Sequence, residues 1–238
     1  MPSAGKFFDV QSSPVPPVTV DPTDTALVIV DMQYHDAHPA GVFNVAMDRI
    51  APGSMDYFNE RTETVTVPSI ARLLRFSREA GLHVVHLMLG AADRGYADLT
   101  PRLREWVLSV ERRSGVADVF WAGHPDFRIR SELEPVDSEA VVRKTAFGAF
   151  NGSDLDDRLR QRGIRNLVLT GISTNCCVES TTRDAAERGY GCVVVDDGTA
   201  DYEPEAHEAS LRALSFNHAR VVRTVDDVMR ACEDGRPV

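Results

Sequence analysis

The sequence predicts an α/β protein with a three-layer, doubly wound fold, in which a mainly parallel six-stranded sheet carries helices on both faces. Two observations predict this fold. Six short runs rich in Val, Ile and Leu alternate with longer segments whose apolar residues recur at helical spacing. The runs are apolar at nearly every position rather than at alternate positions, which is typical of strands that are buried on both faces.

The six apolar runs have the length of single strands, and turn-forming residues bound most of them. We therefore expect strands at residues 26–31, 83–88, 140–143, 167–170, 192–196 and 220–223.

Helical patterns with recognisable ends fill most of the intervals between these runs. The first helix carries Ile70, Leu73 and Leu74 on one stripe. Gly81 supplies its stop, and Ser153 suits the N-cap of the second helix. We expect helices at residues 67–80, 153–163, 177–189, 205–217 and 225–232.

Two long segments, residues 34–64 and 89–126, interrupt this alternation. Long connections in a compact domain are often lids or binding loops, and we expect that role here. The chain of 238 residues otherwise fits one domain. We expect an N-terminal arm at residues 1–22 and a single domain at residues 23–238.

The composition excludes several classes of partner. Asp and Glu outnumber Lys and Arg by 36 to 26, and a net charge of −10 argues against binding to nucleic acid or to an anionic membrane. No apolar run approaches the roughly 20 residues that span a bilayer, and the N-terminal residues lack the pattern of a secretory signal. We expect a cytoplasmic protein whose four cysteines are reduced thiols.

Three reactive residues follow three different predicted strands. Asp31 ends the first strand, Lys144 follows the third, and Cys177 comes shortly after the fourth. Because ligands of open parallel sheets bind beyond the carboxyl ends of the strands, we expect these side chains to meet at one edge.

Each of these residues also has an ordinary structural explanation. Cys177 stands at a predicted helix start, where the helix dipole favours thiolate, but free cysteines are often small buried apolar residues. Asp31 could cap the loop that follows it, and Lys144 could be solvated. The presence of Cys177, Asp31 and Lys144 together favours a cysteine nucleophile with an aspartate as its general acid–base partner.

The motifs around these residues resemble those of the isochorismatase-like cysteine hydrolases. They are Val-Ile-Val-Asp-Met-Gln at Asp31, Arg-Lys-Thr-Ala-Phe at Lys144, and Thr-Gly-Ile-Ser-Thr-Asn-Cys-Cys-Val-Glu-Ser-Thr-Thr-Arg-Asp-Ala at Cys177. The resemblance spans about residues 21–229. It implies a catalytic triad of Cys177, Asp31 and Lys144, a cis peptide between Ile172 and Ser173, and an oxyanion hole formed by the amides of Ser173 and Cys177.

The family resemblance also implies a substrate class. Hydrolysis of the isochorismate ether needs no thiol, so Cys177 indicates the amide-hydrolysing branch of the family. The amino-acid sequence of the cysteine motif is most similar to that of ureidoacrylate and biuret hydrolases. We expect C–N hydrolysis of a small linear amide or ureido compound through a cysteine-bound acyl or carbamoyl intermediate, with release of ammonia or carbamate. Alternatives are a nicotinamidase-like enzyme, an N-carbamoyl amino acid amidase, or a non-catalytic protein that senses thiol oxidation at Cys176 and Cys177.

Metal, cofactor and assembly expectations follow from the same resemblance. Nicotinamidases carry a metal site with an Asp and His pair after the second strand, but the segment after His86 has no second histidine. His35 and His38 are available in the loop expected after Asp31, yet histidines in loops are usually polar surface residues. We expect no metal and no cofactor, and a homo-oligomer, either a tetramer or a dimer.

The wall of the pocket is expected to contain residues from several segments of the chain. Residues expected to line it are Tyr34, Asn44, Phe147, Phe150 and Asn217. The two phenylalanines could equally belong to the core. His207, at the predicted start of the fourth helix, is expected to have a structural or capping role.

Overall fold

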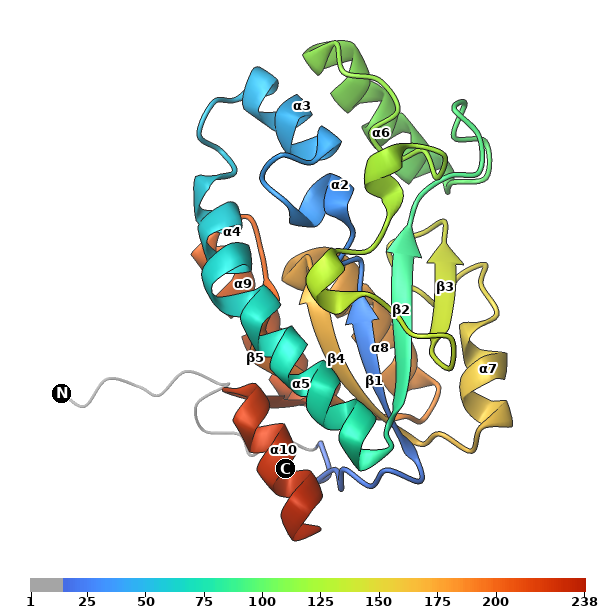
Figure 1. Ribbon diagram of the computed structural model, residues 1–238, viewed down its shortest axis with the longest axis vertical. Helices are drawn as coiled ribbons and strands as arrows, with labels where there is room; N and C mark the ends of the chain where they lie inside the picture. The colour runs from blue at the N-terminus through green and yellow to red at the C-terminus, as the bar shows by residue number, and fades with distance from the viewer. Residues whose placement is uncertain (1–14) are drawn as a thin grey trace, which may run out of the picture.

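The computed structural model describes residues 15–238 and contains the predicted sheet (Figure 1). Its six strands are parallel and lie in the order β3-β2-β1-β4-β5-β6. Each predicted strand is present, and β4 and β5 are longer than predicted. The bounds are β1 (Thr25–Val30), β2 (His83–Leu89), β3 (Ala140–Lys144), β4 (Asn166–Ile172), β5 (Gly191–Ala200) and β6 (Arg220–Val222).

Helices cover both faces of this sheet, which confirms the doubly wound fold. In Figure 1, α5 and α10 lie in front of the sheet and α8 and α9 lie behind it. The connection through α7 runs across the sheet in the same direction as the one through α8, so the right-handed crossover rule places α7 on the rear face as well. The bounds are α5 (Val67–Ala80), α7 (Leu155–Gln161), α8 (Glu179–Glu187), α9 (Pro204–Asn217) and α10 (Val225–Asp234).

Residues 34–64 are mostly helical and residues 89–126 contain the helix α6, so the expectation of irregular loops is wrong for these parts, although both segments contribute residues to the cavity described below. The sequence does carry signals for the two ends of α6. Proline is tolerated in the first turn of a helix, where Pro101 stands, and Gly115 caps the other end in the left-handed conformation. Several of these helices lie beyond the carboxyl ends of the strands (Figure 1). The elements are α2 (Tyr34–Ala37), α3 (Val42–Ile50), α4 (Asp56–Arg61), η1 (Thr62–Thr66), α6 (Pro101–Ser114), η2 (Pro125–Phe127) and η3 (Ser131–Leu133).

Residues 15–22 of the expected N-terminal arm pack against the C-terminal end of the same chain. Val18 and Val238 exchange two backbone hydrogen bonds, with N···O distances of 3.4 and 2.9 Å. Val15, Val18 and Val20 are buried. Residues 1–14 of that arm lie outside the described residues. Within residues 15–238, no helix combines the length and the apolar character needed to cross a membrane.

The order of the strands reverses between β1 and β4, and this junction positions the site. From β1 the chain moves outward to β2 and β3, then returns to the other side of β1 for β4. Gly171, near the end of β4, has φ +105°, and a Cβ there would lie 2.0 Å from the carbonyl oxygen of Val30. Glycine therefore lets the ends of β1 and β4 approach closely at the point where such folds bind ligands.

Candidate active site

The three predicted reactive residues meet at the junction of β1 and β4. Lys144 Nζ lies 2.8 Å from Asp31 Oδ2 and 3.3 Å from Cys177 Sγ. All three are buried, with exposed fractions of 0% for Lys144, 1% for Asp31 and 5% for Cys177. Cys177 belongs to a short helical turn, η4 (Thr174–Val178), between β4 and α8. The structure therefore brings together the residues that the strand ends predicted.

Lys144 is fixed as an ammonium group by several acceptors. Besides Asp31 and Cys177, Nζ donates to the carbonyl oxygens of Ala146 at 3.1 Å and Phe147 at 3.0 Å. Burial alone would lower the pKa of Lys144, but the carboxylate of Asp31 and the sulfur of Cys177 hold it above its ordinary value. A fixed positive charge thus stands beside the sulfur.

Asp31 is the acidic partner of Lys144 at the end of β1. Its backbone is in the left-handed region at φ 51°, which is uncommon for a residue with a side chain and redirects the chain at the end of β1. Burial raises the pKa of the Asp31 carboxyl. The positive charge of Lys144 and the neighbouring Cys177 thiol both lower it and so oppose part of this rise. Lys144 joins the carboxyl and the thiol, because its Nζ atom lies 2.8 Å from Asp31 Oδ2 and 3.3 Å from Cys177 Sγ.

The resting form of Cys177 differs from the thiolate expected at a helix start. Its hydrogen bond with Cys176 and its burial raise the pKa of the Cys177 thiol well above the ordinary value, although Lys144 acts in the opposite direction. The same hydrogen bond lowers the pKa of Cys176. The contact with Cys176 and burial therefore favour the neutral thiol, whereas Lys144 favours the thiolate.

The turn that carries Cys177 is held by backbone hydrogen bonds. The peptide bond between Ile172 and Ser173 is cis. The amides of Cys176 and Val178 both donate to the Ser173 carbonyl oxygen at 3.1 Å. The amide of Asn175 donates to Asp201. These bonds fix the direction of the chain where it enters η4.

A buried polar chain supports the same turn from α9 and β5. Thr174 Oγ1 lies 2.9 Å from His207 Nδ1, and His207 Nε2 lies 2.9 Å from Asp196 Oδ1. Arg61 donates to the same Asp196 oxygen at 2.9 Å, and Ser210 donates to the Thr174 carbonyl oxygen at 3.2 Å. His207, expected to be structural, therefore links the nucleophile turn to two other elements.

Replacing His207 by alanine is expected to lower the free energy of unfolding by about 1–3 kcal/mol, since the buried Thr174 hydroxyl loses its partner. Urea denaturation followed by circular dichroism measures this loss. His218→Ala is the control, because the half-buried ring of His218 lies beside Arg183 at the surface rather than beside Thr174. A change within about 0.5 kcal/mol is expected there. Equal losses in the two variants would contradict a special role for His207.

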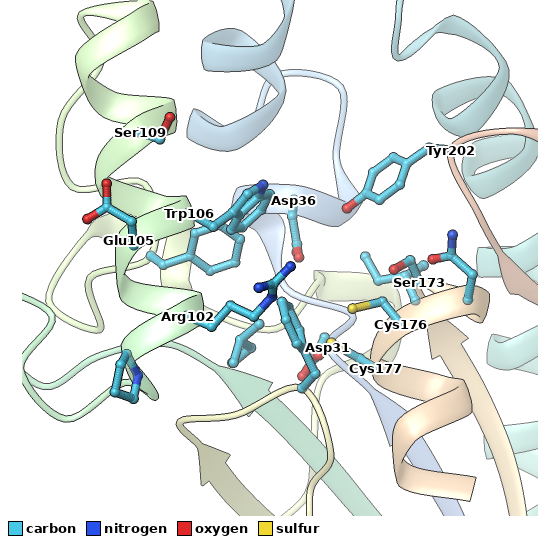
Figure 2. A pocket seen from close by; sticks show the side chains of 16 residues that line it. Asp31, Asp36, Arg102, Glu105, Trp106, Ser109, Ser173, Cys176, Cys177 and Tyr202 are labelled. Carbon is cyan, nitrogen blue, oxygen red and sulfur yellow. The ribbon is translucent and has the colours of Figure 1, made fainter. Parts of the chain in front are cut away.

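A cavity of about 850 Å³ opens above the three reactive residues. Asp31, Cys176 and Cys177 form one end of it, and Phe147 contributes to its wall. Figure 2 shows α6 on the opposite side, with Arg102 and Trp106 directed toward the cavity. Glu105 also lines the cavity, but its side chain is largely exposed and pairs with Arg112. A reactive thiol therefore faces a cavity large enough for a small organic molecule.

Of the five residues expected in the pocket wall, the structure places only Phe147 there. The other four lie elsewhere among the described residues. Tyr34 stacks on His38, with ring centroids 4.0 Å apart, and Phe150 packs against Tyr190 at 5.8 Å. Asn44 is buried and donates to the Asp36 carbonyl oxygen at 2.8 Å, while Asn217 is exposed at the end of α9. These four predictions do not describe this cavity.

The three histidines considered as metal ligands have other neighbours. His86 Nε2 lies 3.0 Å from Glu139, and His38 stacks on Tyr34. Burial lowers the pKa of His35 to about 3, and its ring contacts Phe120 edge-on at 4.7 Å. Within residues 15–238, His, Cys, Asp and Glu side chains form no group of three or more that could hold a metal ion.

Several cavity residues were missed at the level of sequence. Arg102, Glu105 and Trp106 recur at spacings of three and four on one face of α6, which is a helical signal. Asp36 and Tyr202 carry no comparable pattern, because Asp36 lies in the four-residue helix α2 and Tyr202 in the connection between β5 and α9. Recognising α6 from its first-turn proline and its terminal glycine would have indicated the first three.

Fold and site together describe an α/β protein that holds a buried cysteine beside an aspartate and a lysine at the edge of its parallel sheet. Comparison with known proteins assigns the family: the isochorismatase domain model matches residues 25–227. The chain belongs to the isochorismatase family, within which it is an amidohydrolase-like cysteine hydrolase.

Curated relatives and solved structures agree with this assignment. The chain is 34% identical over 226 residues to the ureidoacrylate amidohydrolase RutB of Variovorax paradoxus, covering 90% of this chain and 84% of that protein. A cysteine hydrolase from Pseudomonas syringae pv. phaseolicola superposes with a TM-score of 0.75 at 26% identity, covering 94% of this chain and all of the other. The N-carbamoylsarcosine amidase of Thermoplasma acidophilum gives a TM-score of 0.59 at 26% identity, covering 84% and 96%.

Proposed function

We propose that the protein hydrolyses a C–N bond of a small linear amide or ureido compound through an intermediate bound to Cys177. The observation that carries this proposal is the contact of Lys144 Nζ with both Asp31 and the Cys177 thiol at one end of the cavity. A thiol, a proton acceptor and a fixed cation are the components that nucleophilic acyl transfer requires.

The first half of the reaction follows from these contacts. Asp31 accepts the proton of Cys177, and the sulfur attacks the substrate carbonyl carbon. The nitrogen then leaves with a proton from Asp31, giving ammonia and a thioester or an S-carbamoyl enzyme. In the second half, Asp31 removes a proton from water, which attacks the same carbon and releases Cys177. Lys144 stays protonated throughout and balances the negative charge that moves between sulfur and carboxylate.

The oxyanion formed in each half of the reaction is assigned to the amides of Ser173 and Cys177. The support is local: the amides of Asn175, Cys176 and Val178 in the same turn already donate to protein oxygens. Donors held in place before the reaction stabilise developing charge strongly, and removing one commonly costs about 100- to 1000-fold in rate.

A ureido group is the favoured reacting unit. The names of two relatives, ureidoacrylate amidohydrolase and N-carbamoylsarcosine amidase, both refer to ureido acids. Arg102 offers a guanidinium at the cavity that could take a carboxylate of such a compound. An N-carbamoyl amino acid is therefore the second candidate substrate class, beside uncharged ureido compounds.

The experiment that tests this function is a screen for ammonia release. Biuret, ureidoacrylate, N-carbamoyl amino acids, maleamate and nicotinamide are incubated with the protein, with the Cys177→Ser variant as the blank and with parallel wells containing a chelator. We expect ureido compounds to release ammonia only with the unmodified protein and irrespective of the chelator. Release of ammonia by the Cys177→Ser variant at the same rate would overturn the proposal.

A further inference from the structure

Two neighbouring side chains of α6, Arg102 and Trp106, face the cavity from the side opposite Cys177, and the chemical steps assign no role to either. They are four residues apart, so they lie next to each other on one face of the helix. Both are exposed, whereas Cys177 and the two aspartates of the wall, Asp31 and Asp36, are buried. Figure 2 shows Arg102 and Trp106 directed from α6 into the cavity. A molecule whose reacting carbonyl lies at Cys177 therefore places its other end against these two side chains.

The cavity is larger than a minimal ureido acid requires. Its volume is about 850 Å³. N-Carbamoylglycine has about eight non-hydrogen atoms, and at about 30 Å³ for each, the volume of a water molecule in the liquid, it fills no more than about 240 Å³. More than half of the cavity therefore remains for a further group of the substrate.

Arg102 is a cation whose charge is not already used by the protein. It forms no hydrogen bond or ion pair with residues 15–238, and within that range it is the only lysine or arginine in the cavity wall. Glu105, three residues further along α6, pairs instead with Arg112 at 2.7 Å, and Asp31 pairs with Lys144. A guanidinium presents parallel N–H donors that match the two oxygens of a carboxylate. The charge of Arg102 therefore favours a substrate with a carboxylate at this end.

Trp106 offers an apolar surface beside this cation. Its ring packs against Phe43 and Phe120, with ring centroids 5.6 and 5.7 Å apart, and these two rings also pack against each other at 5.4 Å. Both phenylalanines are buried, so they hold the indole in place, yet Trp106 itself stays 39% exposed. Phe120 lines the same cavity. A fixed and exposed indole in a cavity wall is a surface that an apolar group of a ligand can cover.

We propose that α6 selects the substrate, because Arg102 binds its carboxylate and Trp106 packs against a bulky apolar group. The substrate class that carries both groups beyond a terminal carbamoyl is an N-carbamoyl amino acid with a large apolar or aromatic side chain. Its carbamoyl carbon lies at Cys177, and its carboxylate and side chain leave the α-carbon in two directions, one toward each of the two α6 residues. This inference rests on the proposed amidohydrolase function and narrows its substrate.

The test uses four ureas that combine the two groups in all ways. N-Carbamoylphenylalanine carries both, N-carbamoylglycine carries only the carboxylate, phenethylurea carries only the ring, and ethylurea carries neither. Ammonia release gives kcat/KM for each urea with the unmodified protein and with the Arg102→Met, Trp106→Ala and Trp106→Phe variants; the two enantiomers of N-carbamoylphenylalanine are measured separately. Arg113→Met is the matched control, because Arg113 is an exposed arginine of α6 that does not line the cavity.

We expect the unmodified protein to hydrolyse one enantiomer of N-carbamoylphenylalanine with the highest kcat/KM of the four ureas. Arg102→Met is expected to lower kcat/KM about 10-fold for the two carboxylates and less than about 3-fold for the two uncharged ureas; 10-fold is the low end for hydrogen bonds to a charged group, since Arg102 is exposed. Trp106→Ala is expected to lower it about 10-fold for the two compounds with a ring and less than about 3-fold for the other two. Trp106→Phe keeps an aromatic face and is expected to recover most of that loss. Arg113→Met is expected to match the unmodified protein with every urea.

Ionic strength supplies a second readout, which a loss of folding would not imitate. Salt screens the attraction between an exposed guanidinium and a carboxylate, since the Debye length falls from about 10 Å at ~0.1 M to about 3 Å at ~1 M. KM for N-carbamoylphenylalanine is therefore expected to rise across this range, while KM for phenethylurea does not. In Arg102→Met, the rise with salt is expected to disappear.

The outcomes separate this inference from the function on which it rests. Equal losses for all four ureas in Arg102→Met or Trp106→Ala would mean that the residue only supports the fold or a contact between copies of the chain. A higher kcat/KM for N-carbamoylglycine or ethylurea than for N-carbamoylphenylalanine would mean that the outer cavity binds no apolar group. Either result, or activity in the ammonia screen without activity on these four ureas, overturns the inference and leaves cysteine-dependent hydrolysis intact. If no compound of either set releases ammonia, the proposed function itself is wrong, and the inference fails with it.

Discussion

Replacement of Cys177 by alanine is expected to lower kcat for amide hydrolysis by at least about 10⁴-fold, which is the usual scale for loss of a nucleophile. The Cys177 sulfur lies 3.3 Å from the Lys144 ammonium, which is itself paired with Asp31, at the end of the cavity. Because the thiol is small and buried, the fold should survive the change. Ammonia release at saturating substrate measures the effect, and thermal unfolding checks the fold.

Cys176→Ala is the matched control for this prediction. Cys176 is the adjacent thiol, it lines the same cavity, and its hydrogen bond raises the pKa of Cys177. Its removal should leave kcat within about 10-fold and shift the ionisation of Cys177 to lower pH. A large loss of activity in Cys176→Ala together with a small loss in Cys177→Ala would reverse the assignment of the nucleophile.

Replacement of Lys144 by methionine is expected to lower the free energy of unfolding by about 3–5 kcal/mol, the usual cost of leaving one partner of a buried ion pair alone. Lys144 and Asp31 are both buried, and their charged atoms are 2.8 Å apart. In the variant, burial would raise the pKa of Asp31 further, because Lys144 no longer opposes the rise. A carboxyl with a raised native pKa loses stability as pH rises above its unfolded value of about 3.9, by about 1.4 kcal/mol per unit until the native pKa is reached.

Urea denaturation at pH 5 and pH 7 therefore tests this account, with the larger loss expected at pH 7. The double variant Asp31→Asn/Lys144→Met removes both charges and should recover most of the lost stability while remaining inactive. A single variant as stable as the unmodified protein, or a double variant no more stable than the single one, would show that the pair is not a buried ion pair in solution.

The fold could be predicted because its signals are local. A continuous apolar run such as residues 26–30 predicts a strand that is buried on both faces, and β1 is buried at every position. The positions of Asp31, Lys144 and Cys177 then follow from topology, since parallel strands place their carboxyl ends at one edge. Two features of different origin, the strand pattern and the family motif, indicated the same three residues.

The pocket wall could not be predicted in the same way, because it depends on how separate elements pack. Phe147 and Phe150 are three residues apart in an irregular segment, yet one lines the cavity and the other contacts Tyr190. Asp36 reaches the cavity only because residues 34–64 fold into short helices rather than an open loop. The raised pKa of Cys177 was also missed, because it depends on a side-chain contact with Cys176 that sequence adjacency does not specify.

The central claim is that Cys177 carries the reacting group, and mass spectrometry of the quenched enzyme tests it most directly. A ureido substrate from the screen is mixed with the protein, the reaction is stopped with acid within a turnover, and the peptide that contains both adjacent cysteines is fragmented. The account predicts an acyl or carbamoyl adduct on Cys177 that forms and decays with turnover and is absent from the Cys177→Ala variant. An adduct on Cys176, or sustained turnover with Cys177 unmodified at every time point, would contradict it.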